Sequence, residues 1–264
     1  MLMEVRNSLK FILLSIKYNI LKEMANRTSF LMNVILMMLN NCSIIIQWVV
    51  FFSLKPDFGG YTFENHIFAI ALTTITYGLT HLCFAGVHNI SKYIEFGALD
   101  KYLTKPKNPL IGVLTSKTQI SAIGDLLFGI ILFLVYYHNP IQIILFIFLS
   151  FLSFLIMLSF FIIINSITFW FIRFSDTVET LTGSYISFSL YPYSIFDTAV
   201  KVLLHTIIPV GFAIYLPVSL FQEFTILKLI ALILVTVINM LLAVLVFNRG
   251  LKRYSSSNMA VVNV

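Results

Sequence analysis

The stretch "IQIILFIFLSFLSFLIMLSFFIIINSITFWFI", Ile141–Ile172, decides the fold class, because none of its thirty-two residues carries a charge. A bilayer core of about 30 Å is crossed by roughly 20 apolar residues in helical form. A stretch of this length predicts a membrane span that tilts in the bilayer or projects beyond it.

The rest of the chain has the same character. Of its 264 residues, 59% are hydrophobic and 11% are charged, and the mean hydropathy is +0.96. A soluble domain carries about 25% charged residues, so the composition predicts an all-α polytopic membrane protein. The net charge of +6 does not indicate a nucleic-acid partner, because basic residues beside apolar spans usually record topology.

Five further stretches are long or apolar enough to be read as spans, which makes six transmembrane helices in all. They are Ser29–Ser53, His66–Asn89, Leu114–Tyr137, Asp176–Tyr191 and Thr225–Phe247.

The segment before the last span is apolar but is interrupted by Pro192, Pro209 and Pro217. Because proline removes a helical hydrogen bond and clashes with the preceding turn, two arrangements remain open. Residues 193–223 form two re-entrant helices on the extracellular side, or residues 198–220 are the fifth full span and residues 176–191 lie on the cytoplasmic face. Both arrangements leave the two termini on the same side.

The basic residues predict the orientation. Fourteen of the seventeen Lys and Arg residues fall on one side of the six-span arrangement, and only Lys55, Lys201 and Lys228 fall on the other. Cytoplasmic segments carry the excess of Lys and Arg. We therefore expect both termini in the cytoplasm, including a tail over residues 249–264.

Residues 1–28 predict an amphipathic helix that lies along the cytoplasmic membrane interface. Arg6, Lys10 and Lys17 occupy faces other than the apolar one, which is the pattern of a basic interfacial helix. The helix is a simple anchor or, alternatively, a lever that also touches a cytoplasmic partner. The apolar residues at helical spacing are Val5, Leu9, Ile12, Leu13, Ile16, Ile20 and Met24.

Several polar residues fall inside the predicted spans, where such groups face protein or water rather than acyl chains. Two readings remain open for them: contacts between helices, or a translocation path or subunit seam. Asp125 is expected to hydrogen-bond a neighbouring helix or to face a wet cavity. The residues are Asn33, Asn40 and Gln47 at intervals of seven, Asp125, and Ser184 and Ser187 in the small, polar fifth span.

Catalytic and metal chemistry find no support in the sequence. None of the eleven glycines begins a phosphate-binding G-x-x-x-x-G-K-[ST] loop. His81 and His88 can share a helix face, but Cys83 points elsewhere, so too few ligands converge for a metal. Asp125 has no second carboxylate in a span core for an intramembrane protease. We expect no catalytic residue, no metal site and no cofactor in this chain.

The stretch "YIEFGALDKYLTKPKNPL", Tyr93–Leu110, is polar and turn-rich between two apolar runs. Its apolar residues can form one face of a short helix that stops at Lys105, since the residue before Pro106 disfavours α geometry. A second turn signal, Asn108-Pro109, precedes the next span. The stretch is a topology-setting loop or a helix with a partner to contact.

Three stretches together resemble the type-2 ABC transporter permease family, in an exporter-type subgroup of bacteria. The first is "EFGALDKYLTKPKNPL", with Gly97, Leu99, Asp100, Leu103 and Pro106 in the family's pattern. The second is the proline-marked segment from Pro192 to Leu220. The third is "RGLKRYSSSN", with Gly250, Leu251, Tyr254 and Ser256. The resemblance runs in order along nearly the whole chain.

The resemblance implies a membrane subunit of an ATP-driven exporter, with residues 29–248 as the permease domain. A coupling segment at residues 91–110 would dock on the ATPase through a helix at about Ser91–Lys105, and residues 193–223 would be extracellular re-entrant helices. The partners would be two copies of an ABC ATPase, which hold the ATP and Mg, and a second permease chain, identical or homologous. The expected coupling residues are Ile94, Glu95, Gly97, Leu99, Asp100, Lys101, Leu103 and Pro106.

The expected location is the bacterial cell membrane, with a multi-pass topology. An apolar or amphipathic cargo, such as a peptide, an antimicrobial or a lipid-like compound, would suit the apolar spans. The alternative function is a membrane enzyme or a membrane scaffold without transport activity. Leu99 and Leu103 are the expected apolar anchors for the ATPase, with Glu95 and Asp100 setting partner choice by charge.

Overall fold

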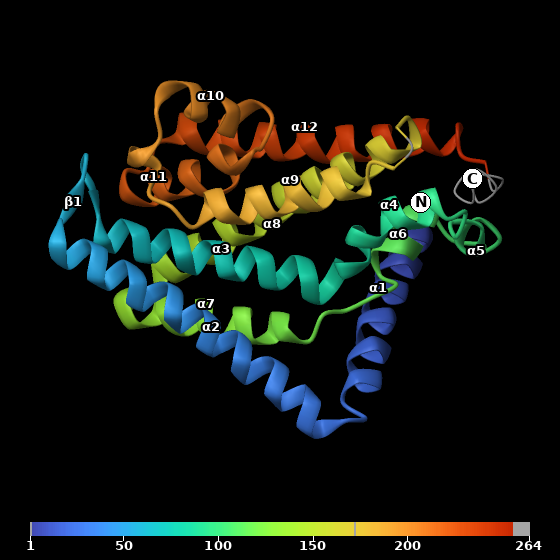
Figure 1. Cartoon of the computed structure of the whole chain (residues 1–264), viewed down its shortest axis with the longest axis horizontal. Helices are drawn as coiled ribbons and strands as arrows, with labels where there is room; N and C mark the ends of the chain where they lie inside the picture. Colours follow the sequence, from blue (N-terminus) through green and yellow to red (C-terminus); the bar gives the residue numbers. More distant parts are fainter. Residues whose placement is uncertain (1, 172, 256–264) are drawn as a thin grey trace.

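The computed structural model describes residues 2–171 and 173–255, which form an elongated bundle of helices with one short β-hairpin (Figure 1). The first half contains α1 (Leu2–Glu23), α2 (Arg27–Leu54), β1 (Asp57–Phe58), β2 (Tyr61–Thr62), α3 (Phe63–Phe84), the 3₁₀ turn η1 (Ala85–Asn89), α4 (Ile90–Glu95), α5 (Asp100–Leu103), α6 (Pro109–Leu114) and α7 (Ser121–Tyr136). The second half contains α8 (Pro140–Ser166), η2 (Ile167–Phe169), α9 (Ser175–Ser189), η3 (Tyr193–Ile195), α10 (Thr198–Thr206), the π-helical turn η4 (Gly211–Tyr215), α11 (Leu216–Gln222) and α12 (Ile226–Leu251).

The long helices run along the molecule and separate two ends (Figure 1). Both ends of the chain lie at one end of the molecule, together with α4, α5 and α6, and the β1–β2 hairpin lies at the other end, with α10 and α11. Within residues 2–171 and 173–255, four helical stretches are long and apolar enough to cross a membrane: α2, α3 continued to Glu95, α8 continued to Phe169, and α12. The prediction of an all-α polytopic membrane protein is therefore confirmed at this level.

The remaining predicted spans are less regular. Helix α7 is apolar but has only 16 residues. Helix α9 has 15 residues and is rich in Ser and Thr. The pair α10 and η4–α11 is bent by 89° at a short break, which is the geometry of a broken span or of a re-entrant loop. The six-span count and the re-entrant segment remain predictions.

Helices α3 and α8 form the core, and α2 and α12 form the flanks. Over an apolar stretch of 18 residues, 72% of the residues are buried in α3 and in α8. Over a stretch of the same length, 17% are buried in α2 and in α12. Leu39 and Ile46 of α2 and Leu241 of α12 point outward, where lipid would cover them.

Glycines let α7 approach α2 and α3 closely. A Cβ atom on Gly124 would lie 2.5 Å from the carbonyl oxygen of Val34, and one on Gly129 would lie 2.6 Å from Cγ1 of Ile75. Small residues at helix crossings are typical of membrane proteins, where close backbone packing replaces the hydrophobic effect as the driving force.

The third predicted span, Leu114–Tyr137, is wrong at its beginning. Helix α6 ends at Leu114, and the continuous helix α7 starts only at Ser121. The linker between them is held to α3 because the backbone N–H of Gln119 donates to the carbonyl of His81 at 3.0 Å. The N–H of Gln119 makes this bond in place of a helical hydrogen bond within the linker. The chain therefore turns before α7 begins.

The predicted N-terminal helix is present as α1, and it runs across the direction of the long helices (Figure 1). Leu9 and Leu13 are exposed along it, as an interfacial helix requires. The side-chain amide of Asn19 donates to the carbonyl of Thr115 at 3.1 Å and to the hydroxyl of Thr118 at 3.3 Å. These bonds attach α1 to the linker before α7, whereas its placement in a membrane interface stays a prediction.

Candidate functional site

The candidate site is the segment between α3 and α7, at the end of the molecule that holds both chain ends (Figure 1). The single short helix expected over Ser91–Lys105 is wrong, because the segment contains two helices, α4 and α5. Gly97 separates them with φ +66°, a left-handed conformation that glycine adopts without strain. Helix α5 is followed by Thr104, close to the predicted stop before Pro106.

On both sides of Gly97 the apolar residues of the segment fall into an inner set and an outer set. The side chains of Ile94 and Leu99 are buried against the chain's own core, at 2% and 0% exposure. Phe96 and Leu103 point outward, with 48% and 40% exposure. Of the two predicted apolar anchors, Leu103 is thus available to a partner, and Leu99 holds the segment to the bundle.

The charged residues of α5 are placed by aromatic neighbours. The ammonium group of Lys101 lies 4.1 Å from the centroid of the Tyr93 ring and 4.9 Å from that of Tyr102, so it makes cation–π contacts with both. Asp100 lies beside Tyr254. Burial and the nearby Asp100 carboxylate raise the pKa of the Tyr254 hydroxyl to about 12.

The end of α12 and the residues after it complete the same region. A Cβ atom on Gly250 would lie 2.2 Å from Cδ2 of Phe169, so only glycine lets α12 pass this ring without a shift. The ring centroids of Phe169 and Tyr254 are 6.4 Å apart. Tyr254 also lies beside Asp100, so the first and the third of the sequence stretches that carry the family resemblance meet in space. Ser256 lies outside the described residues.

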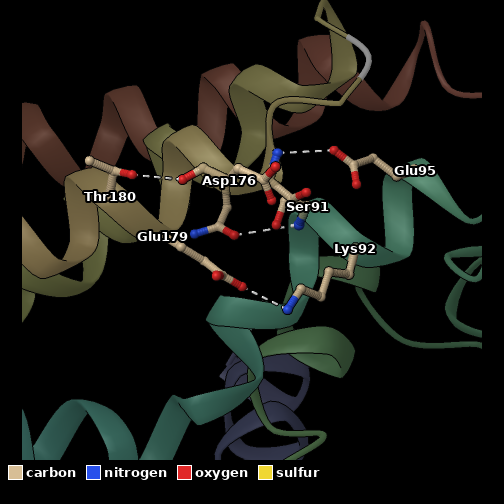
Figure 2. Close-up of polar contacts among 8 residues, drawn as sticks. Ser91, Lys92, Glu95, Asp176, Glu179 and Thr180 are labelled. Carbon is tan, nitrogen blue, oxygen red and sulfur yellow. Dashed lines mark hydrogen bonds and ion pairs between the residues drawn. The ribbon is translucent and has the colours of Figure 1, made fainter.

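Three hydrogen bonds connect α4 to the neighbouring helices, and we call them the α4 clamp (Figure 2). The ammonium of Lys92 lies 2.7 Å from Oε1 of Glu179 in α9. The carboxylate of Glu95 accepts from the backbone N–H of Ser175 at 3.0 Å, at the first residue of α9. The backbone N–H of Ser91 donates to Oδ1 of Asn165, in the last turn of α8, at 3.4 Å.

The α4 clamp combines two weak contacts with one buried contact. Lys92 and Glu179 have side-chain exposures of 52% and 65%, and exposed ion pairs contribute at most about 1 kcal/mol. Glu95 places a negative charge at the N-terminus of α9, where the helix dipole favours it by about 0.3–1 kcal/mol. Asn165 is fully buried, so its amide is held in place by the core. The α4 clamp therefore joins α4 to the start of α9 and to the end of α8.

The predicted polar stripe of α2 is open to the outside of the single chain. Asn33, Asn40 and Gln47 are all exposed. On α9, Ser187 is exposed and Ser184 is half-buried, with its hydroxyl donating to the carbonyl of Thr180 at 2.8 Å. Two polar surfaces thus remain without cover on the described chain.

Asp125 does not join that stripe. It is 2% exposed, and its Oδ1 accepts from the side-chain amide of Asn41 in α2 at 2.7 Å. The expectation that Asp125 bonds a neighbouring helix is confirmed, and its other oxygen, Oδ2, has no hydrogen-bond partner among the described residues. Asn41 lies next to Asn40 in sequence but on the inward face of α2.

Sequence reasoning missed Lys92, Glu179, Asn165 and Asn41. Lys92 and Glu179 are 87 residues apart, and Ser91 and Asn165 are 74 apart. No local pattern connects such pairs. Asn41 was detectable in principle, because it is a second amide in a predicted span and lies one helix face away from Asn40.

Comparison with known proteins gives one match. The model of a family described as ABC-2 family transporter proteins matches residues 35–258. The match covers the long helices, the segment between α3 and α7, and the bent pair before α12. No curated protein and no solved structure matches the chain.

Proposed function

Because the chain belongs to the ABC-2 family of transporter proteins, we propose that it is the membrane-spanning permease subunit of an ATP-driven exporter. In this proposal the chain itself hydrolyses nothing. Two copies of a separate ABC ATPase, with ATP and Mg, supply the energy. The location proposed is the bacterial cell membrane, with both termini cytoplasmic and residues 193–223 as an extracellular re-entrant segment.

The observation that carries this proposal is the arrangement of the segment between α3 and α7. Phe96 and Leu103 are apolar, exposed and carried on elements that Ile94 and Leu99 anchor from inside. Exposed apolar groups flanked by charge, here Lys101 and Asp100, are typical of an interaction surface. We assign ATPase docking to this surface, with Glu95, Gly97 and Pro106 shaping and supporting it.

The α4 clamp gives the docking surface a route into the bundle. If the ATPase moves α4, the bonds from Glu95 and Lys92 move the first turn of α9. Helix α9 also carries the exposed Ser187 and the half-buried Ser184. We propose that this polar face of α9 and the stripe Asn33, Asn40 and Gln47 of α2 line the translocation path or the seam with a second permease chain.

The cargo proposed is an apolar or amphipathic compound, of the kind represented by peptides, antimicrobials or lipid-like molecules. The apolar composition of the spans suits this class.

Co-purification tests the docking surface. The full-length chain and its ATPase are expressed together, and retention of the ATPase is measured for wild type and for the double variant Phe96→Ala/Leu103→Ala. We expect a loss of retention of at least about tenfold, since each truncated apolar anchor removes on the order of 1 kcal/mol or more.

The matched control is Phe224→Ala/Leu227→Ala, which removes a Phe and a Leu that are exposed at the opposite end of the molecule. It should retain the ATPase as wild type does. Undiminished retention by the Phe96/Leu103 variant would show that the docking surface lies elsewhere. ATP-dependent cargo movement in vesicles that hold both subunits tests the exporter assignment itself.

A further inference from the structure

A second polar feature lies beside the last turn of α3. It is a cavity of about 260 Å³, and it is bounded by α3, η1, the linker before α7, and α9. No Asp or Glu is among the lining residues, which make the cavity polar and basic. The polar side chains on which the argument rests are His81, His88, Asn89, Lys117, Gln119 and Thr182.

Hydrogen bonding determines which ring nitrogens of the two histidines carry protons. Nδ1 of His81 lies 2.9 Å from the carbonyl oxygen of Tyr77 and must donate, because a carbonyl only accepts. In a neutral His81 ring, Nε2 then accepts. Nε2 of His88, 2.8 Å away, is the donor of that bond. Nδ1 of a neutral His88 then carries no proton and can only accept a hydrogen bond.

The histidine pair is rigid. The rings of Tyr77 and His81 stack with centroids 3.6 Å apart, and His81 is 2% exposed. The His88 ring is also packed against Phe161, with centroids 5.0 Å apart. The two rings thus form an ordered wall of the cavity, which need not be fixed in place when a ligand binds.

The other lining groups supply donors that lack acceptors. Among the described residues, Lys117 makes no ion pair. The hydroxyl oxygen of Thr182 is buried and has no hydrogen-bond partner in the described structure. Buried polar groups without partners are rare and are usually satisfied by a ligand, an ion or water. A cavity with an unpaired ammonium, free donors and no carboxylate favours an anion.

The position of the cavity indicates which anion. Its linker, on which Lys117 and Gln119 lie, is bonded through Thr115 and Thr118 to Asn19 of α1. Helix α1 is the element expected to lie along the membrane interface, and this is the depth at which phospholipid phosphates lie.

We propose that this cavity binds a phosphate group, with Lys117 as the charged ligand, Asn89 and Thr182 as further hydrogen-bond donors, and the His81–His88 pair as an ordered wall. The phosphate belongs to a phospholipid headgroup or to a free phosphate compound. The site is separate from the α4 clamp and from the docking surface of Phe96 and Leu103, so it does not depend on the transport role.

The test uses the purified full-length chain in detergent and measures its melting temperature. One arm compares inorganic phosphate with chloride at equal ionic strength. The other arm compares short-chain phosphatidylglycerol with diacylglycerol of the same chains, which lacks only the phosphate headgroup. The variant is Lys117→Gln, and the matched control is Lys105→Gln, an exposed lysine at the same end of the molecule.

In wild type and in Lys105→Gln we expect stabilisation by at least one phosphate probe over its partner compound. In Lys117→Gln the apparent affinity should fall by about tenfold, the effect of losing one charged hydrogen bond. Stabilisation by inorganic phosphate identifies a free phosphate compound as sufficient, and stabilisation by phosphatidylglycerol alone identifies the headgroup.

Two results would overturn the proposal. Either neither phosphate probe stabilises wild type more than its partner compound does, or Lys117→Gln responds as wild type does. Lys117 is exposed, so its substitution should leave the melting temperature in chloride unchanged, which separates a binding defect from a folding defect.

Discussion

The two ends of the molecule are held together by different kinds of contact. At the end that carries the candidate site, the α4 clamp joins three helices through hydrogen bonds and one ion pair between exposed side chains. At the opposite end, aromatic rings from α3, α7, α8 and α11 pack face to face or edge to face. There Phe133 and Phe146 stack at 3.7 Å, and Phe68 and Phe221 stack at 4.1 Å.

The difference is one of energy per contact. Exposed ion pairs and cap bonds each contribute about 1 kcal/mol or less, and they can break and re-form. A buried aromatic side chain contributes several times as much, and a core cannot deform gradually around it. From these two sets of contacts we name the end with the hairpin the rigid end and the end with the α4 clamp the adjustable end.

The largest expected effect is at the rigid end. Phe133→Ala removes a ring that contacts Phe68, Phe146 and Phe221. We expect a loss of about 3–5 kcal/mol in the free energy of unfolding, measured by denaturant titration in mixed micelles. The control is Phe148→Ala, whose ring is exposed at 41% on α8. An equal, small loss for both variants would contradict the assignment of rigidity to this end.

The second prediction tests whether η1 is tightly packed against α6 at the adjustable end. A Cβ atom on Gly86 would lie 1.9 Å from the carbonyl oxygen of Val113, so Gly86→Ala must push η1 away from α6. We expect a loss of about 1–3 kcal/mol in the free energy of unfolding. Gly183→Ala on α9 meets no atom within 4 Å and should be neutral or slightly stabilising. If Gly86→Ala changes the free energy of unfolding no more than Gly183→Ala does, the contact between η1 and α6 is also adjustable.

The third prediction concerns the capping contact at α9. Glu95→Ala leaves the N–H of Ser175 without its acceptor and removes the charge at the helix N-terminus. The expected loss is about 0.5–2 kcal/mol in the free energy of unfolding. Glu95→Gln retains an acceptor and should lose less. Coupled ATPase activity should fall in both variants if Glu95 transmits motion, even where stability is nearly unchanged.

The smallest effect is expected for the ion pair. A double-mutant cycle with Lys92→Ala and Glu179→Ala should give a small interaction energy, below the effects of the other three predictions, that decreases as salt is added. The measurement is again the free energy of unfolding in mixed micelles, at two salt concentrations. A coupling of several kcal/mol would mean that the adjustable end is not held weakly.

Much of this architecture was readable from the sequence, for physical reasons. Long apolar runs can only be stable in lipid, so α2, α3, α8 and α12 were located to within a few residues. The segment between α3 and α7 stood out because charge and proline are costly inside a span. Its division was missed, since a glycine within a short amphipathic pattern is compatible with both a continuous helix and a left-handed break.

The rest depended on tertiary contacts. Leu99 and Leu103 have the same local pattern, and only the fold buries one and exposes the other. Lys92 and Glu179 meet because α4 and α9 are neighbours in space, which no spacing in the chain encodes. Asp125 was recognised as costly in a span, but its partner Asn41 had to be seen in three dimensions.

The break at Gly97 has a consequence for how such a subunit diversifies. Because Leu99 attaches the segment from inside while Phe96 and Leu103 face outward, substitutions on the outer residues leave the inner anchor untouched. If this surface docks the ATPase as we propose, the subunit can change which ATPase it accepts while the inner anchor stays the same. The same separation makes Phe96 and Leu103 the positions to randomise when a new partner is to be selected in the laboratory.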